Sequence, residues 1–373
     1  MRKRSSHVRL LVLTLLLLGA SATAALGALQ VSGGSTASAQ QSQKKLTIGF
    51  VTHFVGNPFI KQIEQAARDA GKDLGVNVKI TGTPGFDPAA QLKMVQDLFA
   101  SGADGVSTSI TGDSMAVGLN KLIAQGKPLV EFNIFSTRVQ APYVGERSVG
   151  DWAILGRAVR KAMGGPGAKG LVLIGTCAPG FPALVDRIKG VRRGLGSGLT
   201  IKGPFDVTGD PTKNFSAWQQ LIAANPDAKA LIGVCAQDLE NLGKLNAQHG
   251  DKYITAGGDP TLGNLAAIAG GHGLISMGQT GYVQGYLPIK MIVDALRSKQ
   301  ALPKSGFISS GAEVITKTGV VEPYGLPHLS LARIREFQTN PKVQHAFYKR
   351  LFVGSGPLAN WRKHLEPIAN ASR

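Results

Sequence analysis

Three polar residues stand where an apolar run ends or a helical pattern begins, and their chemistry suits a ligand rich in hydroxyl groups. Asp259 directly follows the run "YITAGG", and a carboxylate there can accept hydrogen bonds from two hydroxyls. Gln279 ends the run "LISMGQ", and its amide offers both a donor and an acceptor. Arg187 falls in the first turns of a helical pattern, where its guanidinium can bind ring oxygens, hydroxyls or a carboxylate.

Simpler interpretations of these residues are structural. Asp259 begins "DPTL" and would also cap a helix. A lone arginine on a helix is more often a solvated surface residue. We expect Arg187 and Asp259 to carry most of the polar recognition in a cleft, with Phe59 supplying apolar contact. We also expect neither polar side chain to belong to a core, so that replacing either one leaves the fold intact.

The segment "THFVGNPFI" breaks an apolar run at Gly56 and resumes with helical spacing. Asn57 is a good helix N-cap and Pro58 suits the first helical position, which explains both residues structurally. Phe59 is less easily explained as part of a cap, and its ring could pack on the apolar face of a ligand. In our interpretation the break starts a helix and also presents one wall of a cleft.

Signals for catalysis or metal binding are weak. The sequence has no G-x-S-x-G, no P-loop and no G-x-G-x-x-G after a strand, and its seven histidines lack a ligand spacing such as H-E-x-x-H. The motif "TGDSMA" around Ser114 faintly resembles a hydrolase motif, but it fits a helix cap better and has no evident histidine partner. We predict no catalytic residue, no cofactor and no metal, and keep an exported hydrolase using Ser114 or Asp259 as an alternative.

Short β-rich runs alternate with helical patterns from Lys45 onward, which predicts an α/β fold of doubly wound parallel sheets. The runs in the first half are apolar throughout, as expected of parallel strands covered on both faces. They are "LTIGFVT", "VNVKI", "DGVSTS", "LVEFN" and "YVGE". Helical patterns fall near 58–74, 88–101, 113–126 and 150–163.

The pattern restarts after the glycine-rich segment 164–170, which predicts a second lobe of similar size. Its strands are predicted at "LVLIGT", "LTIKGPFDV", "KALIGVC", "KYITAGG" and "GLISMGQ". Its helices are predicted near 181–195, 212–224, 238–249 and 261–270, followed by a long helix at 281–298. Helical spacing in "LARIREFQ" and "VQHAFYKRLF" predicts a helical C-terminal tail.

In sheets of this type ligands bind outside the carboxyl ends of the strands, so the residues that follow each strand are candidates for a site. They are Thr52, His53, Ser107, Thr108, Asn133, Cys177, Cys235, Gln237, Asp259 and Gln279. Cys177 and Cys235 end the first and third strands of the second lobe, which are neighbours in the strand order 2-1-3-4-5. A disulfide between them and a pair of buried thiols are both compatible with the sequence.

The N-terminal segment 1–39 has the features of a cleaved signal peptide. Four basic residues precede an apolar run from Leu10 to Ala20, and a small-x-small pattern follows at 37–39. We predict a mature N-terminus near Gln40 and export to a periplasm, without a cysteine for lipid attachment.

The basic balance of the chain does not indicate nucleic-acid binding. Without the four basic residues of the predicted signal peptide, the chain carries 41 − 4 = 37 basic and 23 acidic residues, a net charge of +14. These bases are scattered, with no arginine-rich arm or helix-turn-helix, so we predict no nucleic-acid partner. Attraction to anionic lipid or cell wall stays open.

An ordered set of motifs over about residues 45–320 resembles the periplasmic sugar-binding proteins of ABC importers, of the ribose-binding type. The motifs are "IGFVTHFVGNPF", "SGADGVSTS" with "GDSMAVG", "KPLVEFN", "DRIKGV", "ANPDAKALIGVCAQD" and "GGDPTLGNLAAIAGGHGLISMGQ". The resemblance implies the type I fold, in which two Rossmann-like lobes are joined by a hinge. The N-terminal lobe would then comprise residues 45–147 and 280–308. The C-terminal lobe would comprise 148–279 and 309–322, and residues 323–373 would form a helical extension.

The resemblance also implies a set of ligand-binding residues in the cleft. These are His53, Asn57, Phe59 and Asn133 from the first lobe, and Arg187, Gln237, Asp259 and, near the hinge, Gln279 from the second. The chain departs from the family at Asn133, which is often Asp, and at Ile60, where ribose binders carry a second aromatic. It also has no aromatic around Gly209 to close on a sugar ring, and Phe181 is a candidate replacement from a neighbouring loop. These departures leave the choice among a sugar, a polyol and a similar small polar solute open.

By this resemblance the protein binds its solute by hinge closure and delivers it, as a monomer, to an ABC permease in the inner membrane. A ligand-sensing protein that reports to a membrane receptor is an alternative that the sequence does not exclude. A regulator of the lactose-repressor type shares the two-lobe core, but the signal peptide and the absence of DNA-binding helices in the sequence argue against it.

Overall fold

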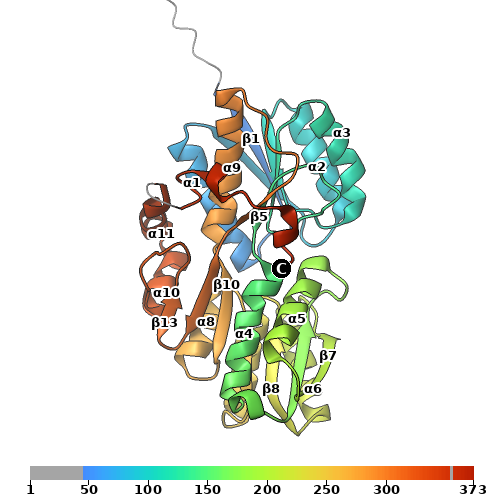
Figure 1. Cartoon of the computed structure of the whole chain (residues 1–373), viewed down its shortest axis with the longest axis vertical. Helices are drawn as coiled ribbons and strands as arrows, with labels where there is room; N and C mark the ends of the chain where they lie inside the picture. The colour runs from blue at the N-terminus through green and yellow to red at the C-terminus, as the bar shows by residue number, and fades with distance from the viewer. Residues whose placement is uncertain (1–44, 353–355) are drawn as a thin grey trace, which may run out of the picture. The chain divides into compact units, whose positions relative to one another are not determined.

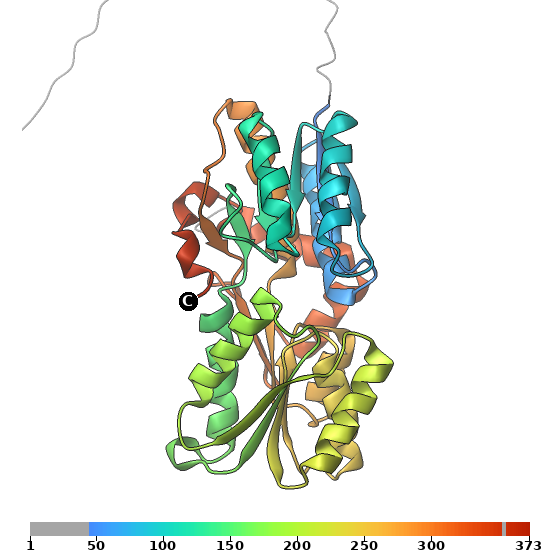
Figure 2. The ribbon, with the colours of Figure 1, turned by 90° about the vertical axis from the view of Figure 1, so that its right-hand side faces the viewer.

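The computed structural model describes residues 45–352 and 356–373, and the predicted signal peptide lies outside them. Two sheets dominate this part of the chain, each with helices on both faces (Figure 1). We call each sheet with its covering helices a lobe. The turned view in Figure 2 shows the two lobes one above the other, with several segments passing between them.

The first sheet has the strand order β11-β5-β4-β3-β1-β2 and is parallel throughout. Its strands are β1 (Thr47–Thr52), β2 (Asn77–Gly82), β3 (Gly105–Thr108), β4 (Leu129–Phe132), β5 (Tyr143–Gly145) and β11 (Phe307–Ser309). The first five strands follow the predicted 2-1-3-4-5 order, so their carboxyl ends meet at one edge. The sequence analysis missed β11.

Helices from distant parts of the chain cover the first sheet. One face carries α1 (Pro58–Asp73) and α9 (Gly281–Ser298), which pack on each other and share a core with β1 and β4. The other face carries α2 (Pro88–Ala100) and α3 (Ala116–Ala124), the latter preceded by the 3₁₀ turn η1 (Asp113–Met115). Because α9 follows five strands of the second sheet in sequence, β6 to β10, the chain must return to complete the first lobe.

The second sheet has the order β13-β12-β10-β9-β8-β6-β7. Its strands are β6 (Leu171–Thr176), β7 (Thr200–Asp206), β8 (Ala228–Gly233), β9 (Ile254–Gly258), β10 (Ile275–Gln279), β12 (Ala312–Thr316) and β13 (Gly319–Val321). The five predicted strands are parallel and again follow the expected order. The sequence analysis missed β12 and β13, and they are antiparallel additions beyond β10.

Close helix packing covers one face of the second sheet. Helices α4 (Ser148–Ala162) and α5 (Pro182–Leu195) lie there with a core that includes Trp152. Glycines allow their backbones to approach: a Cβ on Gly156 would lie 2.4 Å from the Val191 carbonyl oxygen, and one on Gly194 would lie 2.3 Å from the Ala153 carbonyl oxygen. The opposite side carries α6 (Pro211–Ala224), α7 (Asp238–Gln248) and α8 (Leu262–Ala269). Two doubly wound lobes are thus confirmed.

The chain passes between the sheets around 145–148, 279–281 and 309–312. Strand β11 belongs to the first sheet, whereas β12 and β13 belong to the second. This partition is consistent with the lobe boundaries expected from the resemblance, which stay a prediction.

The C-terminal region is helical, as predicted. It contains α10 (Leu331–Thr339), α11 (Pro341–Tyr348) and the 3₁₀ turns η3 (Lys349–Phe352), η4 (Trp361–His364) and η5 (Ile368–Asn370). Helix α10 contacts α8 of the second lobe, and α11 contacts α1 of the first. Near its end the tail bonds to both lobes again, since Glu366 pairs with the backbone of Phe307 and the Ala371 carbonyl accepts a hydrogen bond from the Ser148 amide.

Candidate functional site

A cavity of about 80 Å³ lies between the carboxyl ends of the two sets of strands. We call it the inner cavity. Every ligand-binding residue predicted from the sequence lines it, together with both cysteines. They are His53, Asn57, Phe59, Asn133, Phe181, Arg187, Gln237, Asp259, Gln279, Cys177 and Cys235. The structure therefore brings the whole set together, and their role in ligand binding stays a prediction.

His53 follows β1 and is only 5% exposed. Burial lowers the pKa of His53 to about 3, so the imidazole is neutral at ordinary pH. Its Nδ1 lies 2.8 Å from the Ser109 hydroxyl oxygen, which in turn accepts a hydrogen bond from the Gln91 amide. This series of hydrogen bonds fixes one ring nitrogen of His53 and leaves the other ring nitrogen for a ligand.

Asn57 caps α1 as predicted, since its side-chain oxygen accepts from the Phe59 and Ile60 amides at 2.9 and 3.3 Å. Its amide nitrogen remains for the cavity. Phe59 is 4% exposed and packs near Gly281 at the start of α9. The structural and ligand-facing interpretations of this segment are therefore compatible.

A buried network of neutral side chains joins the lobes at the hinge. The Asn133 amide donates to the Gln279 side-chain oxygen at 3.2 Å and to that of Gln284 at 2.9 Å. Gln284 donates to Gln279 and to the Ser310 hydroxyl. The sequence analysis missed Gln284, although a glutamine within the apolar start of α9 was a usable signal.

Asn133 and Asp259 both have positive φ, at 60° and 66°. A residue in the left-handed region turns the chain sharply, and Asn and Asp tolerate it better than most side chains. Both residues directly follow a strand, β4 and β9 respectively. Local backbone strain of this kind gathers at binding sites, and here it occurs on both sides of the inner cavity.

Arg187 is held by a buried carboxylate that the sequence analysis missed. Its guanidinium donates to both Glu146 oxygens, at 2.7 and 3.1 Å, and to the Val234 carbonyl at 2.9 Å. It also stacks over the Trp152 ring, 4.8 Å from the centroid. Burial opposes the charge of Arg187, but Glu146 and Asp259 more than offset it, and the net effect raises its pKa.

Asp259 completes this charged group. One carboxylate oxygen lies 4.0 Å from Arg187 Nη1, and the other accepts from the Gln279 amide at 3.3 Å. Burial raises the pKa of Asp259 to about 6, against the opposing effect of Arg187 and with a further rise from Glu146. Arg187 and Asp259 are buried, at 6% and 4% exposed, but the hydrophobic core clusters of the described residues include neither of them. That the fold survives their replacement stays a prediction.

Aromatic rings close the cleft between the lobes. Phe181, at the N-cap of α5, stacks on Phe86 from the loop after β2, with centroids 4.4 Å apart. Phe86 also lies near His53 and Phe54. A Cβ on Gly209 would lie 3.3 Å from the Phe54 ring. Phe54 of the opposite lobe therefore lies next to Gly209, and the sequence analysis missed both Phe54 and Phe86. That Phe181 replaces the aromatic missing around Gly209 stays a prediction.

Cys177 and Cys235 form a disulfide in the structure, with their Cα atoms 6.1 Å apart. The predicted proximity is confirmed, because β6 and β8 are paired neighbours. Of the two arrangements compatible with the sequence, the structure has the cross-link. Gln237 lies two residues beyond and donates to the Thr208 carbonyl at 3.0 Å.

Ser114, the residue behind the hydrolase alternative, lies exposed in η1 and lines neither the inner cavity nor the larger cavity beside it. Within residues 45–352 and 356–373, no group of three or more His, Cys, Asp or Glu side chains is arranged to hold a metal ion. In the same part of the chain, no helix combines the length and apolar character needed to span a bilayer.

Two α/β lobes with a polar cavity at the facing strand ends define a two-lobe solute-binding fold of type I. Residues 48–300 match the family of the periplasmic binding protein domain. The chain belongs to this family.

Individual relatives are distant. The xylose/arabinose-binding protein XylF of Sulfolobus acidocaldarius is 23% identical over 299 residues, which cover 74% of this chain and 72% of that protein. The glucose-galactose binding protein GanP of Geobacillus stearothermophilus has a TM-score of 0.66 at 20% identity, with 74% of this chain and 98% of that chain covered. A carbohydrate transporter solute-binding protein of Agrobacterium radiobacter, solved with D-arabinose, has a TM-score of 0.66 at 21% identity, with coverages of 82% and 100%. At these identities the structures establish the fold.

Proposed function

We propose that the protein is the substrate-binding component of an ABC importer and that it takes a sugar, polyol or similar small polar solute into the inner cavity. The observation that carries the proposal is the ring of buried hydrogen-bonding groups contributed by both lobes. His53 and Asn133 lie on one side, and Arg187 and Asp259 on the other. Relatives that bind xylose, arabinose, glucose or galactose support a monosaccharide unit as ligand.

Closure around the solute explains how such a site works. The inner cavity, at about 80 Å³, is well below the roughly 300–1,000 Å³ of ordinary ligand sites. Entry therefore requires the lobes to part or Phe181 to leave Phe86. A solute that contacts both lobes favours the closed state by its greater affinity for it. That state would present the surface recognised by the permease.

Export and release of the signal peptide belong to the same proposal. The family membership supports a periplasmic location. A monomer with its mature N-terminus near Gln40 would diffuse between the solute and the permease. Intact-mass analysis of the exported protein tests this directly, and a periplasmic species that retains Met1 would contradict it.

A ligand screen tests the central claim. Protein purified under native conditions would be analysed by native mass spectrometry and then by thermal shift with pentoses, hexoses and polyols. A ligand at 100 times its dissociation constant adds about 2.7 kcal/mol to the free energy of unfolding. No stabilisation by any of these solutes, together with turnover of a test ester or glycoside, would favour the hydrolase alternative instead.

A further inference from the structure

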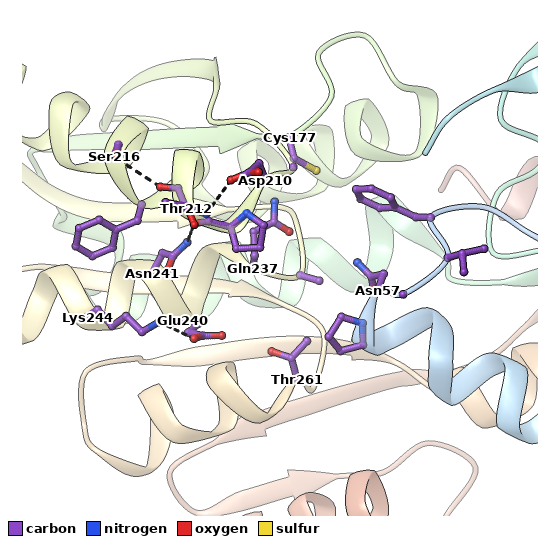
Figure 3. A pocket seen from close by; sticks show the side chains of 18 of the residues that line it. Asn57, Cys177, Asp210, Thr212, Ser216, Gln237, Glu240, Asn241, Lys244 and Thr261 are labelled. Carbon is purple, nitrogen blue, oxygen red and sulfur yellow. Dashed lines mark hydrogen bonds and ion pairs between the residues drawn. The ribbon is translucent and has the colours of Figure 1, made fainter. Parts of the chain in front are cut away.

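A second, larger cavity of about 890 Å³ opens beside the inner cavity. We call it the outer cavity. Six residues line both: Phe54, Asn57, Phe86, Cys177, Ala236 and Gln237. Figure 3 shows Asn57 at the start of α1 on one side of the outer cavity, with Asp210, Thr212 and Gln237 on the other. The two cavities are therefore neighbours that share a wall.

The outer cavity combines aromatic rings with polar groups that can still form hydrogen bonds to a ligand. Phe54, Phe86 and Phe215 supply flat apolar surfaces. Asp210 uses Oδ1 to cap α6, accepting from the Thr212 and Lys213 amides, which leaves Oδ2 for another donor. Thr212 is exposed and adds a hydroxyl. Sugar rings present this same combination, an apolar face of C–H groups bordered by hydroxyls.

Charge in the outer cavity disfavours an anionic occupant. Its ionisable lining consists of Asp210, Glu240 and Lys244. Glu240 and Lys244 are paired with each other at 2.6 Å, so Asp210 leaves a net negative charge. A sugar phosphate or a uronic acid would meet repulsion there, whereas a neutral sugar would not.

From these observations we propose that the physiological ligand is a neutral disaccharide or short oligosaccharide. One terminal sugar unit enters the inner cavity, and the next unit lies in the outer cavity against Phe54 and Phe86. The outer cavity, at about 890 Å³, falls within the range of ordinary ligand sites, whereas the inner cavity, at about 80 Å³, takes one unit only after the lobes part or Phe181 leaves Phe86. The inference rests on the proposed function and specifies its ligand class.

Calorimetric titration of matched pairs tests it: D-xylose with xylobiose, D-glucose with cellobiose, and L-arabinose with arabinobiose. For at least one pair the disaccharide should bind more tightly than its monosaccharide by about tenfold or more. If a monosaccharide binds and no disaccharide binds better, the inference is overturned and the proposed function stands. If neither class binds, the proposed function itself fails.

Substitutions in the wall of the outer cavity test whether the second sugar unit binds there. Ser216 lies exposed on the wall of the outer cavity and does not line the inner one, so Ser216→Trp should fill the outer cavity. We expect it to weaken disaccharide binding by about tenfold or more and to leave monosaccharide binding unchanged. Ala224→Trp is the matched control, exposed two turns further along the same helix and outside the lining, and should alter neither.

A second variant removes a side chain instead of adding one, so that its effect cannot come from distortion of the fold by a tryptophan. Lys244→Ala removes one rim side chain of the outer cavity and should reduce only disaccharide affinity. Circular dichroism would verify folding in each case. Equal effects of Ser216→Trp and Lys244→Ala on the two ligand classes, or no effect on either, would overturn the placement.

Discussion

The two walls of the inner cavity hold their polar groups in different ways. The first-lobe wall is neutral, with His53, Asn57 and Asn133 positioned by hydrogen bonds. The second-lobe wall is charged: Arg187 lies close to Asp259 and also pairs with Glu146, which directly follows β5 of the first sheet and so reaches Arg187 from the lobe boundary. A disulfide additionally cross-links the second wall.

Physical chemistry explains the difference. A buried charge must be partnered before a ligand arrives, since an unpaired one is costly away from water. The second wall is therefore built as a completed ion-pair cluster that offers its remaining donors and acceptors. Neutral amides carry no such requirement, so the first wall can exchange partners when the lobes move. We infer that the second wall contributes most of the affinity for the ligand. The first wall changes its hydrogen-bond partners as the lobes move about the hinge.

The largest effect is expected from Glu146→Ala, which leaves Arg187 buried without its bidentate partner. Breaking a buried pair in this way typically costs about 3–5 kcal/mol of unfolding free energy. The matched control is Asp97→Ala, which removes an exposed pair with Lys93 and should cost less than about 1 kcal/mol. Urea unfolding measures both, and similar small losses would show that the charged wall is not a preformed cluster.

Loss of the cross-link should come next. The double variant Cys177→Ser and Cys235→Ser opens a loop with a sequence separation of 58, and the free energy of unfolding should fall by about 2–4 kcal/mol. Reduction of the parent protein should produce the same loss. Two thiols that label in the denatured, unreduced parent would contradict the disulfide.

Binding variants compare the walls directly. Asp259→Asn removes the charge and nearly preserves the shape, and we expect ligand binding to weaken by about tenfold to several hundredfold, because hydrogen bonds to charged groups are the stronger ones. Asn133→Ala removes a neutral partner and should weaken binding by about tenfold or less. Calorimetry with the identified ligand, alongside circular dichroism, provides the measurement. A larger loss in Asn133→Ala would reverse our assignment of the walls.

Sequence reasoning could predict which residues gather in the inner cavity because the topology rule depends on order alone. Once alternating strands and helices are recognised, Asn133 must lie at the carboxyl edge of the first sheet and Asp259 at that of the second, because each directly follows a parallel strand. The same rule could have found Glu146, which ends the run "YVGE". The burial of Arg187 was not predictable in this way, since Glu146 and Trp152 meet it only after α4 and α5 pack.

The elements that were missed depend on tertiary context. Strands β11 and β13 have three residues each, too few for periodicity to distinguish them from loops. They are strands because neighbouring edges, β5 and β12, bind them. Phe86 lies in a loop, and only the fold of that loop brings its ring onto Phe181 of the other lobe.

The smallest effect that we expect is a dependence of ligand affinity on pH, caused by a carboxyl of the charged wall. Burial raises the pKa of Asp259 to about 6, so lowering the pH from 7 to 5 protonates most of this carboxyl in the free protein. A protonated carboxyl accepts fewer hydroxyl hydrogen bonds, and affinity for a neutral ligand should fall by about tenfold, near the free energy of one pKa unit. His53 cannot be the cause, because its lowered pKa of about 3 keeps it neutral throughout.

Two variants assign this dependence to one carboxyl. Asp259→Asn should bind weakly and equally at pH 5 and pH 7. Burial also raises the pKa of Glu313 to about 7, that of Asp151 to about 7 and that of Asp238 to about 6, so these buried acids titrate in the same range. Glu313 is the one whose pKa Asp259 itself raises further, and it is therefore separated first. Glu313→Gln should keep the parent's pH dependence if Asp259 is responsible. The opposite result would contradict this assignment: affinity that no longer depends on pH in Glu313→Gln, and affinity that still falls at low pH in Asp259→Asn. The titrating group would then be Glu313, near the hinge, and not the carboxyl of the charged wall.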